Sequence, residues 1–288
     1  MYNKISRKAM YKYLVPLVLI NSIQAASYDN KLELGVKTTF YNYTERNDQD
    51  EILDTEKSSL FDTGGLYASY DHKLKEFDTE DGSIAHYINA YASAVYGDTE
   101  YKGSILGSGQ GYGSYVSTTA NSFYEYQLNI KRVQFYKNSS RYISFGFGYK
   151  EWERELSTTQ VENYHYDFAQ IKVGGDTLIY DDISLGLDLG AQLAFNPEMD
   201  ADFTSGTGLH ETFNLGTTYS YLVSVPLQIP IQDELVFVAR AEYEFTSIGK
   251  SDAIAVPDFP NQGDNYSFLE PKSQQKNWHF FAGLQLHF

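Results

Sequence analysis

The densest group of potentially reactive side chains in the sequence is the acidic run RNDQDEILDTE. It contributes the carboxylates of Asp48, Asp50, Glu51, Asp54 and Glu56 within one short segment. Carboxylate oxygens are the ligands that calcium prefers, but a regular calcium loop also has a central glycine and a terminal bidentate glutamate. This run lacks that pattern. We therefore expect a hydrated, electronegative surface here, and no metal ion or cofactor.

A second set of charged side chains is spread along segments in which apolar and polar residues alternate. Counted by parity, they share the more polar face of those segments with the aromatic residues Tyr67, Tyr87, Tyr91 and Trp152. Charges of both signs on one such face form ion pairs in a narrow lumen, or set ion selectivity in a wider one. The predicted lumen-lining residues are Lys37, Glu125, Lys131, Lys150, Asp188, Arg240 and Glu242, and Glu33, Arg154 and Glu244 share their parity.

The elements that carry these charges are predicted to be β-strands, because a period of two puts successive side chains on opposite faces. Residues 183–195 show the period most clearly, with seven apolar residues on one face against Ser, Gly, Asp and Gln on the other. The last twelve residues, NWHFFAGLQLHF, alternate in the same way. Ten strands are predicted in all, at residues 31–43, 59–72, 84–97, 123–137, 141–155, 163–173, 183–195, 213–231, 235–247 and 277–288.

The lengths of strands and connections favour a membrane barrel over a soluble sandwich. About ten residues are needed for a tilted strand to cross a bilayer, whereas soluble strands average five or six. Long polar segments follow the first, third, seventh and ninth strands, and tight turns follow the fourth and eighth. We therefore predict an all-β fold: a single antiparallel up-and-down transmembrane β-barrel of about ten strands, with long extracellular loops and short periplasmic turns. The segment 73–83 is long for a periplasmic turn.

The N-terminus has the order of a secretory signal peptide. Lys4, Arg7, Lys8 and Lys12 precede the short apolar core LVPLVLI and the small residues of NSIQAAS, and that core is too short to span a membrane. We predict cleavage after Ala25, or alternatively after Ala26, which leaves 26–288 as the barrel domain. Removing four of 22 basic residues leaves 18 against 38 acidic ones, a net charge of −20. That charge argues against nucleic acid as a partner.

The chain resembles Gram-negative outer-membrane β-barrel proteins. The resemblance rests on the leader, the ten alternating strands and the final Phe288 with Leu286 and Leu284 at alternating positions. It implies that Leu284, Leu286 and Phe288 form the assembly signal that the barrel-insertion machinery reads. It also implies residence in the cell outer membrane, with outer-membrane lipids and that assembly machinery as partners.

Function is less constrained than fold. The first hypothesis is a structural or surface-interaction role through acidic extracellular loops, and the alternative is a narrow porin-like channel for small cationic solutes. A hydrolase similar to the omptins would need an Asp-x-Asp pair facing an Asp-x-His pair. Asp48 and Asp50 offer the first pair, but none of the six histidines follows an aspartate by two positions. We therefore predict that the protein is not an enzyme.

Overall fold

The computed structural model describes residues 30–104, 111–157, 160–180, 182–203, 209–257 and 265–288, and its elements there are all β-strands. The predicted signal peptide, residues 1–25, and both predicted cleavage positions lie outside the described residues. Among the residues described, no helix is long and apolar enough to cross a bilayer.

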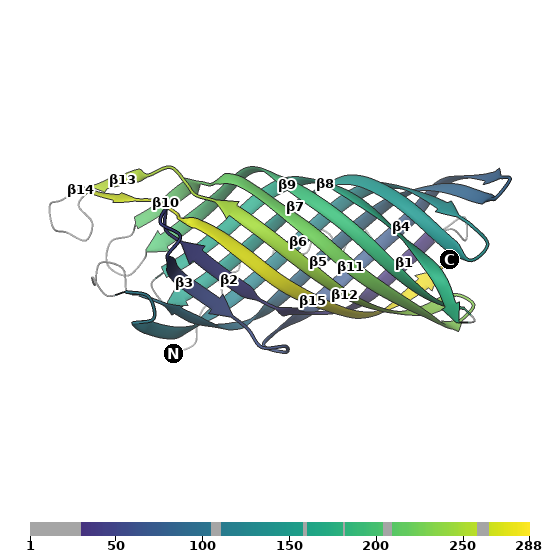
Figure 1. Cartoon of the computed structure of the whole chain (residues 1–288), viewed down its shortest axis with the longest axis horizontal. Helices are drawn as coiled ribbons and strands as arrows, with labels where there is room; N and C mark the ends of the chain where they lie inside the picture. Colours follow the sequence, from purple (N-terminus) through teal and green to yellow (C-terminus); the bar gives the residue numbers. More distant parts are fainter. Residues whose placement is uncertain (1–29, 105–110, 158–159, 181, 204–208, 258–264) are drawn as a thin grey trace, which may run out of the picture.

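Ten long strands form one closed antiparallel ring (Figure 1). Each strand pairs with the next along the wall, and β1 pairs with β15 from Lys31↔His287 to Phe40↔Trp278. The predicted up-and-down barrel is confirmed. The wall strands are β1 (Asn30–Phe40), β4 (Thr63–Thr79), β5 (Gly82–Gly103), β6 (Tyr115–Phe135), β7 (Ser139–Ser157), β8 (Gln160–Tyr180), β9 (Ile183–Phe203), β11 (Gly216–Gln232), β12 (Leu235–Gly249) and β15 (Lys272–His287).

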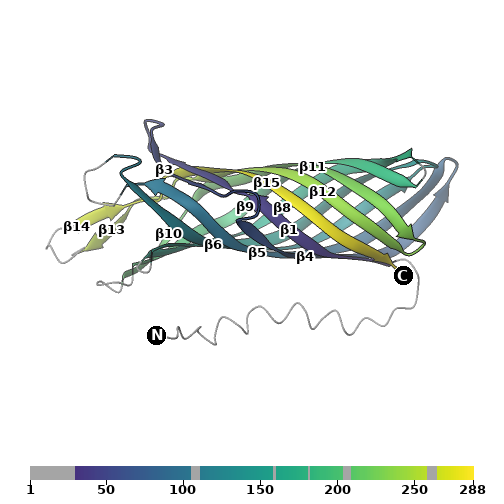
Figure 2. The same cartoon turned by 90° about the horizontal axis from the view of Figure 1, so that it is seen from below.

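Shorter strands extend the barrel at the end away from the C-terminus (Figure 2). They are β2 (Asn42–Arg46), β3 (Ile52–Lys57), β10 (Leu209–Asn214), β13 (Ile254–Pro257) and β14 (Asn265–Phe268). β2 and β3 form a hairpin that takes the places of β1 and β4 between β15 and β5. The first long loop of the sequence prediction is therefore mostly strand.

Several predicted boundaries were wrong. The segment predicted as a long turn at 73–83 is a continuation of β4 and β5, and the turn itself is only Glu80 and Asp81. Most side chains of β4 beyond His72 are exposed. Charged residues outnumber the apolar Leu74 and Phe77 there, so the hydrophobic alternation disappears while the backbone ladder continues. The predicted strands 31–43 and 213–231 are each interrupted, at Tyr41 and Leu215.

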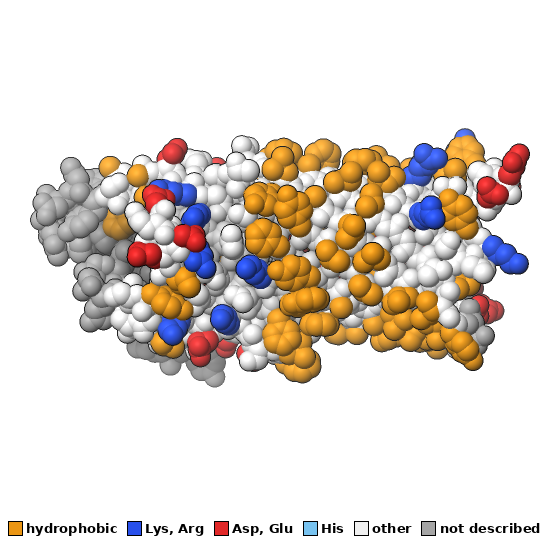
Figure 3. Space-filling model, viewed as in Figure 1, with side chains coloured by type: hydrophobic (Ala, Val, Ile, Leu, Met, Phe, Trp, Pro, Cys, Tyr) orange, Lys and Arg blue, Asp and Glu red, His pale blue; other side chains and the backbone are white. Residues whose placement is uncertain are grey.

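Exposed apolar side chains lie on the outer face of wall strands around the barrel, among them β1, β4, β6, β7, β9, β11 and β15, and Figure 3 shows them as a belt across one face. On β9 it includes Leu185, Leu187, Leu189, Leu193 and Phe195, all of them largely exposed. A continuous exposed apolar band of this kind is the lipid-facing surface of a transmembrane barrel. Charged side chains gather beyond the belt, at the end carrying the short strands. We refer to that end as the outer end, and to the end with Phe288 and the short turns as the periplasmic end.

Candidate functional site in the barrel interior

The structure places all seven predicted lumen-lining side chains on the inner wall, around two separate cavities. The larger cavity, about 240 Å³, lies in the periplasmic half and the smaller one, about 60 Å³, lies farther out. Lys131, Asp188, Arg240 and Glu242 line the larger cavity, Lys37 and Lys150 line the smaller one, and Glu125 lines both.

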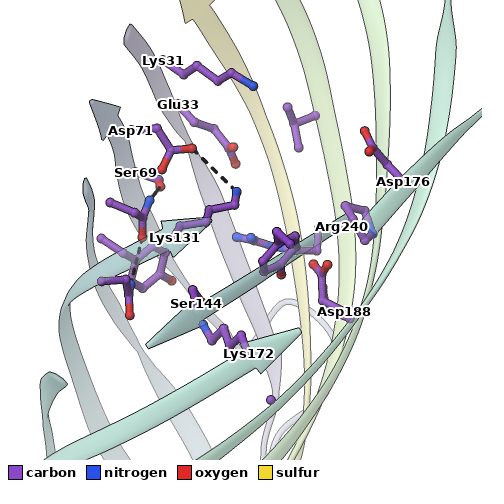
Figure 4. Close-up of a pocket in the computed structure, with 18 of the residues that line it drawn as sticks. Lys31, Glu33, Ser69, Asp71, Lys131, Ser144, Lys172, Asp176, Asp188 and Arg240 are labelled. Carbon is purple, nitrogen blue, oxygen red and sulfur yellow. Dashed lines mark hydrogen bonds and ion pairs between the residues drawn. The ribbon is translucent and has the colours of Figure 1, made fainter. Parts of the chain in front are cut away.

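Charges around the larger cavity are only loosely paired (Figure 4). Lys131 Nζ lies 3.9 Å from Asp71 Oδ2, and Lys172 Nζ donates to Gln127 Oε1 at 3.2 Å. The guanidinium of Arg240 packs 4.0 Å from the ring centre of Phe281. Ion pairs at these separations leave hydrogen-bonding capacity for water or solute.

Around the smaller cavity the charges form a tighter network. Lys150 bonds to Glu244, donates to Gln192 Oε1 at 3.0 Å and lies 3.8 Å from Glu125. Lys37 lies 3.8 Å from the other oxygen of Glu125. Side chains from β1, β6, β7, β9 and β12 are thereby joined across the lumen. Such mutual pairing allows charges to stay in a confined interior.

The outermost layer is centred on Arg154, which is 1% exposed. Its Nε donates to Glu56 Oε1 at 2.9 Å, and its Nη1 donates to Glu162 Oε2 at 2.8 Å. Glu56 is itself 0% exposed. A guanidinium that is fully removed from water needs this kind of complete hydrogen bonding to remain charged.

Aromatic rings pack around this guanidinium. Arg154 lies 4.6 Å from the ring centre of Tyr43 and 5.1 Å from that of Trp152, and Trp152 stacks on Tyr164 at 4.6 Å. These are attractive geometries for a cation and for paired rings. The buried cluster that completes the layer contains Tyr41, Met199, Ala201, Phe213, Leu215 and Ile248. The same cluster includes Tyr43, Trp152 and Tyr164. We call this cluster, together with Arg154 and the carboxylates of Glu45, Asp54, Glu56, Glu162 and Glu270, the outer plug.

The outer plug buries more carboxylates than cations. Burial raises the pKa of Glu270 to about 8, with the nearby Glu162 acting in the same direction, and Glu270 bonds to the hydroxyl of Tyr164 at 2.5 Å. Burial also raises the pKa of Asp54 to about 6 and that of Glu45 well above its ordinary value. These three carboxylates lie beyond the apolar belt, outside the membrane. Their charge therefore depends on the pH of the surrounding water.

Sequence reasoning placed Arg154 on the inner face but missed its partners. Its partners Glu56 and Glu162, like the other buried carboxylates Glu45, Asp54 and Glu270, all fall in segments predicted as loops, and the contacts of Glu56 with Arg154 and of Glu270 with Tyr164 are long-range. The only available signal was that Trp152 and Arg154 share one face of a predicted strand, which places a guanidinium beside an indole.

The candidate hydrolytic carboxylates lie at the exposed outer rim. Asp48 pairs with Lys250 at 2.7 Å, and Asp50 pairs with Lys272 at 3.2 Å. The hydrogen bond and charge of Lys250 lower the pKa of Asp48. Within the described ranges, no group of three or more His, Cys, Asp or Glu side chains is arranged to hold a metal ion.

The predicted assembly residues lie at the seam between β1 and β15. Leu284 and Leu286 project from the outer face and are largely exposed. Phe288 closes the seam through its backbone, since its N–H donates to Asn30 O at 2.9 Å and its carbonyl accepts from Asn30 N at 2.7 Å. This position at the periplasmic end leaves the predicted signal accessible.

Comparison with known proteins identifies the fold. No family model and no curated protein matches the sequence. Among solved structures, the outer membrane protease OmpT from Escherichia coli is similar, with a TM-score of 0.57 and 11% identity over 93% of this chain and 99% of that chain. The transport unit of the autotransporter AIDA-I from E. coli gives a TM-score of 0.43 at 10% identity, covering 96% and 97%. The chain therefore has the fold of an outer-membrane β-barrel, the fold that OmpT also has.

Proposed function

We propose that this protein is a closed outer-membrane barrel whose role is structural and surface-directed, exerted through its acidic outer end. The observation that carries the proposal is the outer plug. Arg154, Tyr43 and Trp152 occupy the interior at the outer end with almost no exposed surface. An interior packed in this way supports a scaffold rather than an open pore.

The outer hairpin β2–β3 provides the surface for interaction. Asp48, Asp50 and Glu51 are exposed at its tip, on a chain with a formal net charge of −16. A partner with a cationic surface would be attracted to this end, and the attraction would weaken as salt is raised. The experiment is to measure binding of a cationic probe protein to the refolded barrel at two ionic strengths, with Asp48→Asn/Glu51→Gln as the variant.

A narrow channel is the second candidate, and the larger cavity favours it. Arg240 and Lys172 face that cavity without a direct ion pair in the described part of the chain, an arrangement that suits a hydrated solute path. Single-channel conductance separates the two candidates, because a closed barrel gives no discrete current steps. The fold shared with OmpT does not carry over a hydrolytic activity, and hydrolysis is not part of this proposal.

A further inference from the structure

A groove of about 490 Å³ lies on the outside of the barrel wall. It is found at the outer margin of the apolar belt, where the chain passes from β1 to β2 and from β3 to β4. Its lining combines aromatic rings with two lysines. The lining residues are Phe40, Tyr41, Asn42, Lys57, Ser58, Lys276, Trp278 and Phe280.

The groove exists because the sheet forks at this level. β1 pairs with β4 up to Thr38↔Gly64, while β2 pairs with β3 from Asn42↔Lys57 onward. Between these two ladders, Ser58 Oγ accepts a hydrogen bond from the backbone N–H of Tyr41 at 2.8 Å and donates to the carbonyl of Thr39 at 3.1 Å. The backbone N–H of Ser58 also donates to Tyr41 O at 3.0 Å, so Ser58 alone bridges the gap between the two ladders, and a groove is left in the outer wall.

The half of the groove nearer the membrane centre is aromatic. Trp278 and Phe280 stack with ring centres 6.5 Å apart, and Phe40 meets Phe280 edge-on at 6.3 Å. Trp278 remains 48% exposed. Exposed Trp at the margin of a lipid-facing belt marks the boundary between acyl chains and headgroups.

The half of the groove nearer the outer end is cationic. Lys57 stands opposite Asn42 in the ladder, and Lys276 lies two residues beyond Trp278 on β15, about 7 Å along the strand. Both lysines are exposed, and in the part of the chain that the structure describes neither forms an ion pair. The outward carboxylate opposite Lys57 is Glu100 on β5. Lys250 and Lys272, by contrast, are each bound to an aspartate.

We propose that this groove binds one phosphate-bearing lipid of the outer leaflet. The phosphate accepts hydrogen bonds from Lys57 and Lys276, and an acyl chain lies over Phe40, Trp278 and Phe280. Charge complementarity carries the assignment, because two unpaired ammonium groups lie at headgroup depth directly above an apolar surface. A protein with an excess of acidic residues would otherwise repel an anionic headgroup here.

The test is native mass spectrometry of the detergent-purified barrel titrated with phosphatidic acid. Each lysine near an anionic headgroup strengthens binding electrostatically, so Lys57→Gln/Lys276→Gln is expected to weaken binding about ten-fold or more. The matched control is Lys250→Gln/Lys272→Gln, which removes the same charge from paired lysines and leaves lipid binding unchanged. Glu100→Gln, which removes the adjacent carboxylate, is expected to tighten binding.

Two further arms identify the bound chemistry. Trp278→Ala is expected to weaken the binding of phosphatidic acid. Inorganic phosphate is expected not to displace the lipid. The site would be overturned if Lys57→Gln/Lys276→Gln and Lys250→Gln/Lys272→Gln weakened lipid binding equally. It would also be overturned if phosphatidylcholine bound as tightly as phosphatidic acid. Displacement of the lipid by millimolar inorganic phosphate would also overturn it, since free phosphate would then be the ligand.

Discussion

Arg154 and Glu56, 98 positions apart in the sequence, meet inside the barrel with a hydrogen bond of 2.9 Å from Nε to Oε1. The bond joins wall strand β7 to the outer hairpin β2–β3. Because both side chains are almost fully buried, they form their hydrogen bonds with protein atoms rather than with water. The contact therefore ties the outer hairpin to the barrel wall.

Replacing Arg154 by Met should destabilise the barrel by about 3–5 kcal/mol, because Glu56 and Glu162 would be left buried without a counter-charge. Chemical denaturation followed by near-ultraviolet circular dichroism, which reports on Trp152 in the same layer, measures the loss. The triple variant Arg154→Met/Glu56→Gln/Glu162→Gln removes the charges together and should recover most of the stability. Equal losses in the single and triple variants would contradict the buried-pair explanation.

The stability of the outer plug should depend on pH through Glu270. Its folded pKa is about 8, against an ordinary value of 4.5, so between these pH values the unfolded state has lost a proton that the folded state keeps. Stability is therefore full below about 4.5 and falls as pH rises toward 8. Hydrogen exchange of the Ser251 amide, which donates to Glu270 O at 2.9 Å, measures this change in the stability of the outer plug. Glu270→Gln should flatten the pH profile, and the exposed Glu100→Gln should not.

Adding a methyl group at Gly283 should strain the barrel seam. A Cβ there would clash with Tyr67 Oη and lie 2.8 Å from Leu34 O, and Tyr67 is held by its hydrogen bond of 2.7 Å to Glu33. Gly283→Ala should cost about 1–3 kcal/mol in the free energy of unfolding. The control is Gly64→Ala, where the nearest atom is 3.9 Å away. The seam explanation fails if both variants unfold alike.

Phe288→Ala should reduce the amount of protein assembled in cells without preventing refolding in detergent. The backbone bonds between residue 288 and Asn30 are kept in this variant, so the barrel itself should still close. Heat-modifiable mobility on gels measures folded protein in both settings. Normal assembly in cells would show that the terminal ring is not an assembly signal.

The membrane-facing part of the fold could be predicted because the lipid imposes a local rule. Every second residue between Ile183 and Phe195 had to be apolar, and the pattern is readable from neighbours in sequence. Beyond the belt no such rule applies. Lys73 to Asp78 continue a strand with water on both faces, so the sequence there looks like a loop.

For each contact in the candidate site, the sequence predicted the position of only one of the two partners. Parity places Lys150 and Arg154 on the inner face, because that depends on the strand alone. Glu162 lies directly opposite Arg154 in the β7–β8 hairpin, whereas pairing Arg154 with Glu56 depends on how β2–β3 folds back over the barrel end. That arrangement is set by long-range packing, which spacing in the sequence does not encode.

Single-channel recording of refolded residues 26–288 in a planar bilayer tests the central claim of a closed interior most directly. The folded wild-type protein should give no discrete current steps, because the outer plug and the Lys150 network interrupt the lumen. Discrete steps whose ion selectivity shifts in Lys150→Ala/Arg240→Ala would contradict that claim and establish a continuous, charge-lined channel.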